Sequence, residues 1–120
     1  MTLDDFEQQI FTVAVASPIC GIPVVRRLTS TAINLRVSVT TGDLIDAFYN
    51  EHTGTTAFAL IRQGQRAFGA DNTGGWHIHP FDDPDRHDPL PGAMSFAELV
   101  AEVERQFGRP QEDAAEDSDQ

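Results

Sequence analysis

The sequence predicts an α+β domain in which an antiparallel meander of four to five strands carries an N-terminal helix and a capped C-terminal helix packed on one face. Apolar residues recur with helical spacing near both ends, whereas the middle of the chain alternates apolar and polar residues. Short turns separate the alternating segments, which forces neighbouring strands to be antiparallel. With 120 residues, 40% of them hydrophobic, the chain can build one core, so we expect one domain over residues 1–109.

The N-terminal element begins at Thr2, an N-cap residue that is followed by Asp4 and Asp5 in the first turn. The next apolar residues are spaced to share one face of a helix, and they are Leu3, Phe6, Ile10 and Val13. Beyond Phe11 the run Thr-Val-Ala-Val-Ala fits a strand as well as a helix. Pro18 closes the segment in either case.

The strands of the meander follow. Residues 24–29 predict a short strand, and residues 33–39 alternate apolar and polar side chains, as a strand with one solvent face does. Further strands are expected at residues 44–49, 56–61 and 66–70, each after a turn rich in Gly, Asn or Asp.

The C-terminal helix has the clearest signals. Ser95 and Glu98 match a capping box, and one apolar stripe follows: Phe96, Leu99, Val100, Val103 and Phe107. Gly108 and Pro110 predict the end of this helix. Residues 110–120 hold five acids, no base and no large apolar residue, so we expect a disordered acidic tail there.

The balance of acidic and basic residues indicates where in the cell the protein works and which partners it can bind. The chain has a net charge of −11 and no lysine, and residues 1–109 alone hold 14 acids against 8 arginines. Such a composition fits a halophilic cytoplasm or a GC-rich genome, and its field repels nucleic acid unless high salt screens it. Cys20 is the only cysteine, the N-terminus is acidic, and no apolar run could span a bilayer. We therefore expect a cytoplasmic protein with no membrane partner.

The unusual residues gather in the long connection over residues 69–89, which holds three of the four histidines and the only tryptophan. A connection of this length is usually functional or disordered, and its apolar residues Trp76, Ile78 and Phe81 favour anchoring to the core. If residues 76–79 are extended, His77 and His79 lie on one face, about 7 Å apart. His87 and an aspartate from residues 82–88 could close around them.

Three interpretations fit this histidine pattern. His77, His79 and His87 could bind a divalent metal such as zinc. They could instead perform acid–base catalysis without metal, because imidazole titrates near neutral pH and phosphodiester cleavage needs a proton acceptor and a proton donor. A phosphate would then be held by an arginine, namely Arg62, Arg66 or Arg86. In the third interpretation the imidazoles hydrogen-bond loop carbonyls and are structural.

Asp71 and Asn72 admit a similar choice. Before Thr73-Gly74-Gly75 they are ordinary turn residues. As site residues, the carboxylate of Asp71 would orient a histidine and the amide of Asn72 would donate to an anion.

Residues 33–107 resemble the TumE-like toxins of toxin–antitoxin modules, a group of small prokaryotic proteins. In both, a strand meander leads through an arginine-bearing strand into an Asp-Asn loop with histidines and prolines, and a capped helix follows. The residues that match by type and order are Arg66, Asp71, Asn72, His77, His79 and His87. Residues 67–70 separate Arg66 from Asp71 here, and Gly74-Gly75-Trp76 suits a distinct subfamily.

The resemblance implies a toxin that cleaves RNA or inhibits translation, with a cognate antitoxin as partner. On this hypothesis the chain is a metal-independent ribonuclease whose acid–base or positioning groups are His77, His79, His87, Arg66 and Asp71. Substrate contacts are expected from Arg62, Arg86, Asn72 and Trp76. The alternative is a non-catalytic binding or self-associating module, a homodimer through an exposed sheet edge, in which the cluster is structural or binds zinc.

Overall fold

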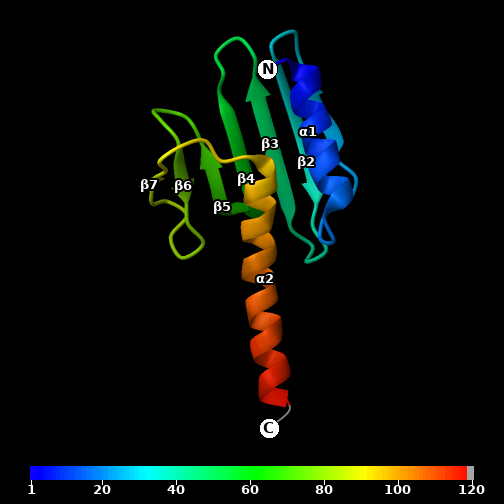
Figure 1. Ribbon diagram of the computed structural model, residues 1–120, viewed down its shortest axis with the longest axis vertical. Helices are drawn as coiled ribbons and strands as arrows, with labels where there is room; N and C mark the ends of the chain where they lie inside the picture. Colours follow the sequence, from blue (N-terminus) through cyan, green and yellow to red (C-terminus); the bar gives the residue numbers. More distant parts are fainter. Residues whose placement is uncertain (119–120) are drawn as a thin grey trace.

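The computed structural model describes the backbone of residues 1–118 and the side chains of residues 1–107. It confirms the α+β class, with a helix at each end of the described chain and an antiparallel sheet between them (Figure 1). Helix α1 spans Leu3–Ala16, and helix α2 spans Phe96–Ser118. Within the described residues, neither helix is long and apolar enough to cross a lipid bilayer.

The sheet has seven strands in sequential order, so the predicted number of four to five is wrong. Each strand pairs with the next one in antiparallel orientation. The strands are β1 (Val24–Leu28), β2 (Ala32–Ser38), β3 (Leu44–Asn50), β4 (Thr56–Arg62), β5 (Gln65–Asp71), β6 (His77–His79) and β7 (Asp88–Pro89). The five longer strands lie where the sequence predicts them. β6 and β7 lie inside the long connection. β6 gives residues 77–79 the extended conformation that the sequence offers as one possibility, whereas β7 has two residues and is too short to show an alternating pattern.

The residues beyond Phe11, for which the sequence fits a strand as well as a helix, belong to helix α1. The Thr2 side chain accepts a hydrogen bond from the backbone N–H of Asp5, and the Asp5 carboxylate accepts one from the N–H of Thr2. This capping box starts the helix, and its buried face holds Phe6, Ile10 and Ala14. The helix ends before Pro18, because a residue that precedes proline disfavours the helical conformation.

Both helices pack on the same face of the sheet, as predicted. Phe58 of β4 stacks against Phe6 of α1, with 6.3 Å between ring centroids, and meets Phe96 of α2 at 5.5 Å. Burial alternates along the central strands, so their other side chains point to the opposite, open face. Figure 1 shows α1 and α2 side by side in front of the sheet.

Helix α2 begins as predicted but continues further. The Ser95 hydroxyl accepts from the N–H of Glu98, and the Glu98 carboxylate accepts from the N–H of Ser95. The helical backbone then runs past Gly108 and Pro110 to Ser118 and projects away from the sheet (Figure 1). Residues 111–117 are mostly Gln, Glu and Ala, which have high helix propensity. This propensity offsets the free-energy cost of the one backbone hydrogen bond that Pro110 cannot donate. Residues 119–120 of the predicted tail lie outside the described residues, and the division at residue 109 remains a prediction.

The two edges of the sheet differ. All five residues of β1 are exposed, and three of them are large and apolar: Val24, Val25 and Leu28. The opposite edge is β7, which has two residues and includes a proline that cannot donate to a further strand. The unusual histidines lie beside this second edge.

Candidate functional site

The pairing of β5 with β6 brings the first site residues together. Asp71 lies directly opposite His77, and Gly69 lies opposite His79. Between them, the pair Ala70 and Ile78 faces the core, where Ala70 is fully buried. Because side chains alternate along a strand, Asp71, His77 and His79 share the open face of the sheet.

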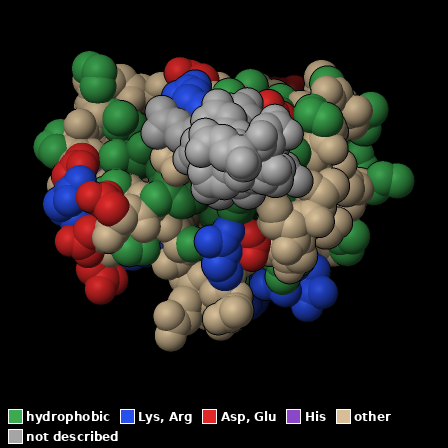
Figure 2. All heavy atoms as spheres, turned by 90° about the horizontal axis from the view of Figure 1, so that it is seen from below, with side chains coloured by type: hydrophobic (Ala, Val, Ile, Leu, Met, Phe, Trp, Pro, Cys, Tyr) green, Lys and Arg blue, Asp and Glu red, His purple; other side chains and the backbone are tan. Residues whose placement is uncertain are grey.

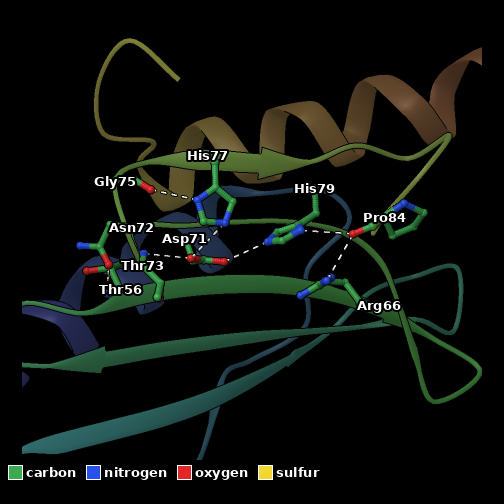
Figure 3. Close-up of polar contacts among 9 residues, drawn as sticks. All are labelled: Thr56, Arg66, Asp71, Asn72, Thr73, Gly75, His77, His79 and Pro84. Carbon is green, nitrogen blue, oxygen red and sulfur yellow. Dashed lines mark hydrogen bonds and ion pairs between the residues drawn. The ribbon is translucent and has the colours of Figure 1, made fainter. Parts of the chain in front are cut away.

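The Asp71 carboxylate faces both imidazoles at once (Figure 3). Its Oδ2 lies 3.0 Å from Nε2 of His79, and its Oδ1 lies 3.3 Å from Nε2 of His77. Oδ1 also accepts a hydrogen bond from the backbone N–H of Thr73 at 3.0 Å. Burial raises the pKa of Asp71, but the hydrogen bonds from His79 and Thr73 and the charge of nearby His77 outweigh burial and lower it. Asp71 is therefore a carboxylate over the physiological pH range.

The second nitrogen of each ring faces a backbone carbonyl. Nδ1 of His77 lies 2.9 Å from the Gly75 oxygen, and Nδ1 of His79 lies 3.2 Å from the Pro84 oxygen (Figure 3). Carbonyl and carboxylate oxygens only accept hydrogen bonds. All four contacts are therefore favourable together only if each ring carries two protons, or if another cation lies between the Nε2 atoms and Asp71.

His87 completes the cluster from the loop between β6 and β7. Its ring stacks on His77 with 4.6 Å between centroids and meets His79 edge-on at 4.5 Å. His79 is 2% exposed, His77 is half-buried, and His87 is exposed. One nitrogen from each ring lies within 4.8 Å of the others, which makes these three side chains the metal-binding candidates among the described residues.

Arg66 reaches the cluster through the Pro84 carbonyl. Its guanidinium donates a 3.2 Å hydrogen bond to the same oxygen that faces His79 (Figure 3). The rest of the Arg66 side chain is exposed and lines an open hollow of about 460 Å³ with Gln65, Pro84 and Asp85. A cationic group thus lies at the rim of the cluster, in reach of solvent.

The connection is anchored as the sequence predicts. Phe81 stacks on Phe68 of the core with 4.2 Å between ring centroids, and Trp76 and Ile78 also pack against the core. Arg86 makes two hydrogen bonds of 2.9 and 3.0 Å to Asp88 and lies 3.6 Å from Asp82. Figure 2 shows acidic and basic side chains gathered on the side of the molecule where β6 and β7 lie. These contacts hold the loop that carries His87.

The structure brings together His77, His79, His87, Arg66 and Asp71, the five residues predicted as acid–base or positioning groups. The predicted substrate contacts are placed differently. Arg62 forms an ion pair with Asp43 and lies over the Phe107 ring. Arg86 forms an ion pair with Asp88 of the same loop.

Asn72 links the start of β4 to the end of β5. Its side chain accepts from the N–H of Thr56 and donates to the Gly54 carbonyl, 2.9 Å away in each case. Trp76 packs against the core. The contacts of Asn72 and Trp76 are therefore structural ones. Of the three arginines predicted to hold a phosphate, Arg66 is the one that faces the cluster.

The sequence indicates that the imidazoles could hydrogen-bond loop carbonyls, but it does not identify which carbonyls accept these bonds. The carbonyls of Gly75 and Pro84 set both ring orientations, and nothing in a side-chain pattern marks a carbonyl. Gly69 is also missed. A Cβ at Gly69 would lie 2.5 Å from the Phe58 carbonyl oxygen, so β5 needs glycine there. A lone glycine inside a predicted strand is the signal that could have indicated this close approach.

Chemically, the cluster can hold and transfer protons, bind an anion through Arg66, or hold a metal ion. Its imidazoles range from fully buried to exposed, so they can differ in role. Comparison with family models, curated proteins and solved structures finds no match for this chain.

Proposed function

We propose that the chain is a TumE-like toxin-module protein of the cytoplasm that cleaves RNA with the histidine cluster. The observation that supports this is the convergence of three imidazoles, the Asp71 carboxylate and Arg66 at one edge of the sheet, with His87 exposed. A cognate antitoxin is the expected protein partner.

The roles follow from exposure. His87 is exposed and the His77 side chain keeps 12% of its surface exposed, whereas His79 is almost fully buried, so we assign His87 and His77 as the proton acceptor and the proton donor. His79 is 2% exposed and cannot touch RNA, so it is a positioning residue that holds Asp71 beside His77. Arg66 contacts the phosphate and stabilises the charge that develops on it.

The reaction needs no outside reactant. One imidazole removes the proton of the ribose 2′-hydroxyl, the 2′-oxygen bonds to phosphorus, and the bond from phosphorus to the 5′-oxygen breaks. The other imidazole donates a proton to that leaving oxygen. The products are a 2′,3′-cyclic phosphate and a 5′-hydroxyl, and the two histidines exchange protonation states.

The test compares growth and RNA cleavage for the intact chain, His87→Ala and His52→Ala. His52 lies on an exposed turn and is the one histidine outside the cluster, so it is the matched control. We expect the intact chain and His52→Ala to arrest growth and to cleave RNA in EDTA, and His87→Ala to cleave about 100-fold more slowly. RNA with 2′-deoxy sugars should resist cleavage.

Two outcomes would contradict the proposal. One is the absence of both growth arrest and RNA cleavage by the intact chain at every salt concentration from low to molar, a range that the acidic surface requires. The other is equal cleavage by His87→Ala and the intact chain, which would locate the activity elsewhere.

The alternative, a non-catalytic module, is favoured by one observation: both nitrogens of His77 and of His79 already face acceptors. In such a module the cluster ties β5, β6 and the following loop together. His87→Ala would then leave growth unaffected, as would the intact chain, while Asp71→Ala would unfold the domain at a lower denaturant concentration.

A further inference from the structure

The orientation of His77 and His79 is that of metal ligands. In each ring Nδ1 faces a backbone carbonyl, so a neutral ring would carry its proton on Nδ1 and its lone pair on Nε2. A hydrogen bond from one imidazole nitrogen to a carbonyl is what usually fixes the tautomer and direction of a histidine that binds metal through the other nitrogen.

Both Nε2 atoms then converge on the same place. They lie 3.0 and 3.3 Å from the two oxygens of Asp71, and a lone pair facing a carboxylate is repulsive unless a cation lies between them. Two extra protons would create two adjacent imidazolium rings, 4.9 Å apart by centroid, with one carboxylate between them. A single divalent ion supplies the same positive charge at one point.

A third imidazole is within reach of this point. His87 stacks on His77 and meets His79 edge-on, and no hydrogen bond from another described residue reaches its ring. Pairing of β7 with β6 and the ion pair of Arg86 with Asp88 hold the backbone on both sides of His87. The backbone therefore keeps the exposed His87 ring close to the cluster, and no hydrogen bond from the described residues fixes the direction of its nitrogens.

We propose that His77, His79 and His87 bind one zinc ion, with Asp71 as the fourth ligand or as the carboxylate beside it. Tetrahedral zinc holds imidazole nitrogens at about 2.0–2.1 Å, which separates two ligand nitrogens by about 3.4 Å. The three nitrogens already lie within 4.8 Å of one another, so rotation of the exposed His87 ring closes the difference. Three imidazoles and a carboxylate are a zinc donor set, whereas magnesium and calcium prefer oxygen ligands.

The site uses the same side chains as the proposed RNA cleavage but does not depend on it. Bound zinc would occupy the lone pairs that acid–base catalysis needs, so zinc would switch the cleavage off. Metal binding is measured without RNA, and the proposed cleavage is measured in EDTA. The two proposals can therefore fail separately.

The experiment uses the full chain purified without a histidine tag and stripped of metal with EDTA. Zinc binding is measured by calorimetry, and the geometry by the visible absorption of cobalt(II), which differs between tetrahedral and aqueous sites. We expect one ion per chain, a tetrahedral cobalt spectrum and a higher melting temperature with zinc. His87→Ala should weaken binding at least about 10-fold, and His52→Ala should leave binding unchanged.

His87 is exposed, so its variant should fold like the intact chain, and thermal unfolding in EDTA checks this. His77→Gln provides a second ligand variant if the first is unstable. The proposal is overturned if the intact chain binds no zinc, if His87→Ala and His77→Gln bind it as tightly as the intact chain, or if cobalt keeps its aqueous spectrum.

Discussion

Asp43 and Asp71 are two shielded carboxylates that face different kinds of cation. Asp43 precedes β3 and pairs with Arg62, whose guanidinium lies 2.9 Å away, whereas Asp71 ends β5 and faces the imidazoles of His77 and His79. The hydrogen bond from Arg62 lowers the pKa of Asp43, and Asp71 also has a lowered pKa. A guanidinium never loses its charge, but imidazole exchanges a proton or takes a metal.

This difference distinguishes the Asp43–Arg62 pair, which stabilises the fold, from Asp71 and its histidines, which can take part in chemistry. The Asp43–Arg62 pair has one state at physiological pH, and the Arg62 side chain is 45% exposed. The partners of Asp71 are imidazoles whose side chains are only 3% and 12% exposed. A lowered carboxylate pKa alone does not locate a functional site, and the identity of the partner decides.

The largest expected effect is on stability when Asp71 is removed. Asp71→Ala leaves Nε2 of buried His79 and the N–H of Thr73 without their acceptor, so we expect a loss of about 3 kcal/mol. Asp43→Ala should cost about 1–2 kcal/mol, because the half-exposed Arg62 regains water. Urea unfolding of both variants measures the difference. Equal losses would remove the distinction between the two carboxylates.

The second effect concerns the strand that carries Asp71. Gly69→Ala places a Cβ 2.5 Å from the Phe58 carbonyl oxygen, so β5 must move away from β4 at a cost of about 2 kcal/mol. Gly92→Ala is the matched control, since nothing lies within 4 Å of a Cβ there. Denaturant midpoints compare the two. A stable Gly69→Ala variant would show that Asp71 does not depend on this close approach.

Sequence reasoning predicts what depends on local chemistry. The Thr2 and Ser95 caps, the apolar stripes and the alternation of the longer strands fix both helix starts and the meander, and the crowding of histidines locates the site. The pairing of Arg62 with Asp43 was not predicted, because these residues are 19 positions apart and meet only through the strand register. The Pro84 carbonyl and β7 are closer in sequence to their partners, but their contacts depend on the course of an irregular loop, which no side-chain pattern indicates.

The contribution of the Asp43–Arg62 pair to folding stability should depend on pH. The pKa of Asp43 is lowered in the folded protein from an ordinary value of 3.8, chiefly by the hydrogen bond from Arg62. A lowered folded pKa stabilises the protein above the unfolded pKa, and this contribution disappears as the pH falls through the folded pKa. The stability gap between the intact chain and Asp43→Asn should therefore be largest near neutral pH and close below about pH 4. A gap of the same size at pH 7 and at pH 2 would mean that packing, and not the ion pair, carries the effect.

The smallest effect is expected for Arg86, whose ion pairs with Asp82 and Asp88 are exposed. Arg86→Gln should change stability by less than about 1 kcal/mol, and the change should vanish in 1 M salt, because solvent and ions screen such pairs. Arg66 makes no ion pair among the described residues, and it hydrogen-bonds the carbonyl that orients His79.

Arg66→Gln should therefore leave stability as unchanged as Arg86→Gln does but slow the proposed RNA cleavage at least about 10-fold, because it removes the cation at the rim of the cluster. Parallel measurement of unfolding and cleavage for both variants tests this. If Arg86→Gln slows cleavage more than Arg66→Gln, the phosphate contact belongs to the loop and not to β5. The loop pair would then have to open before the substrate binds.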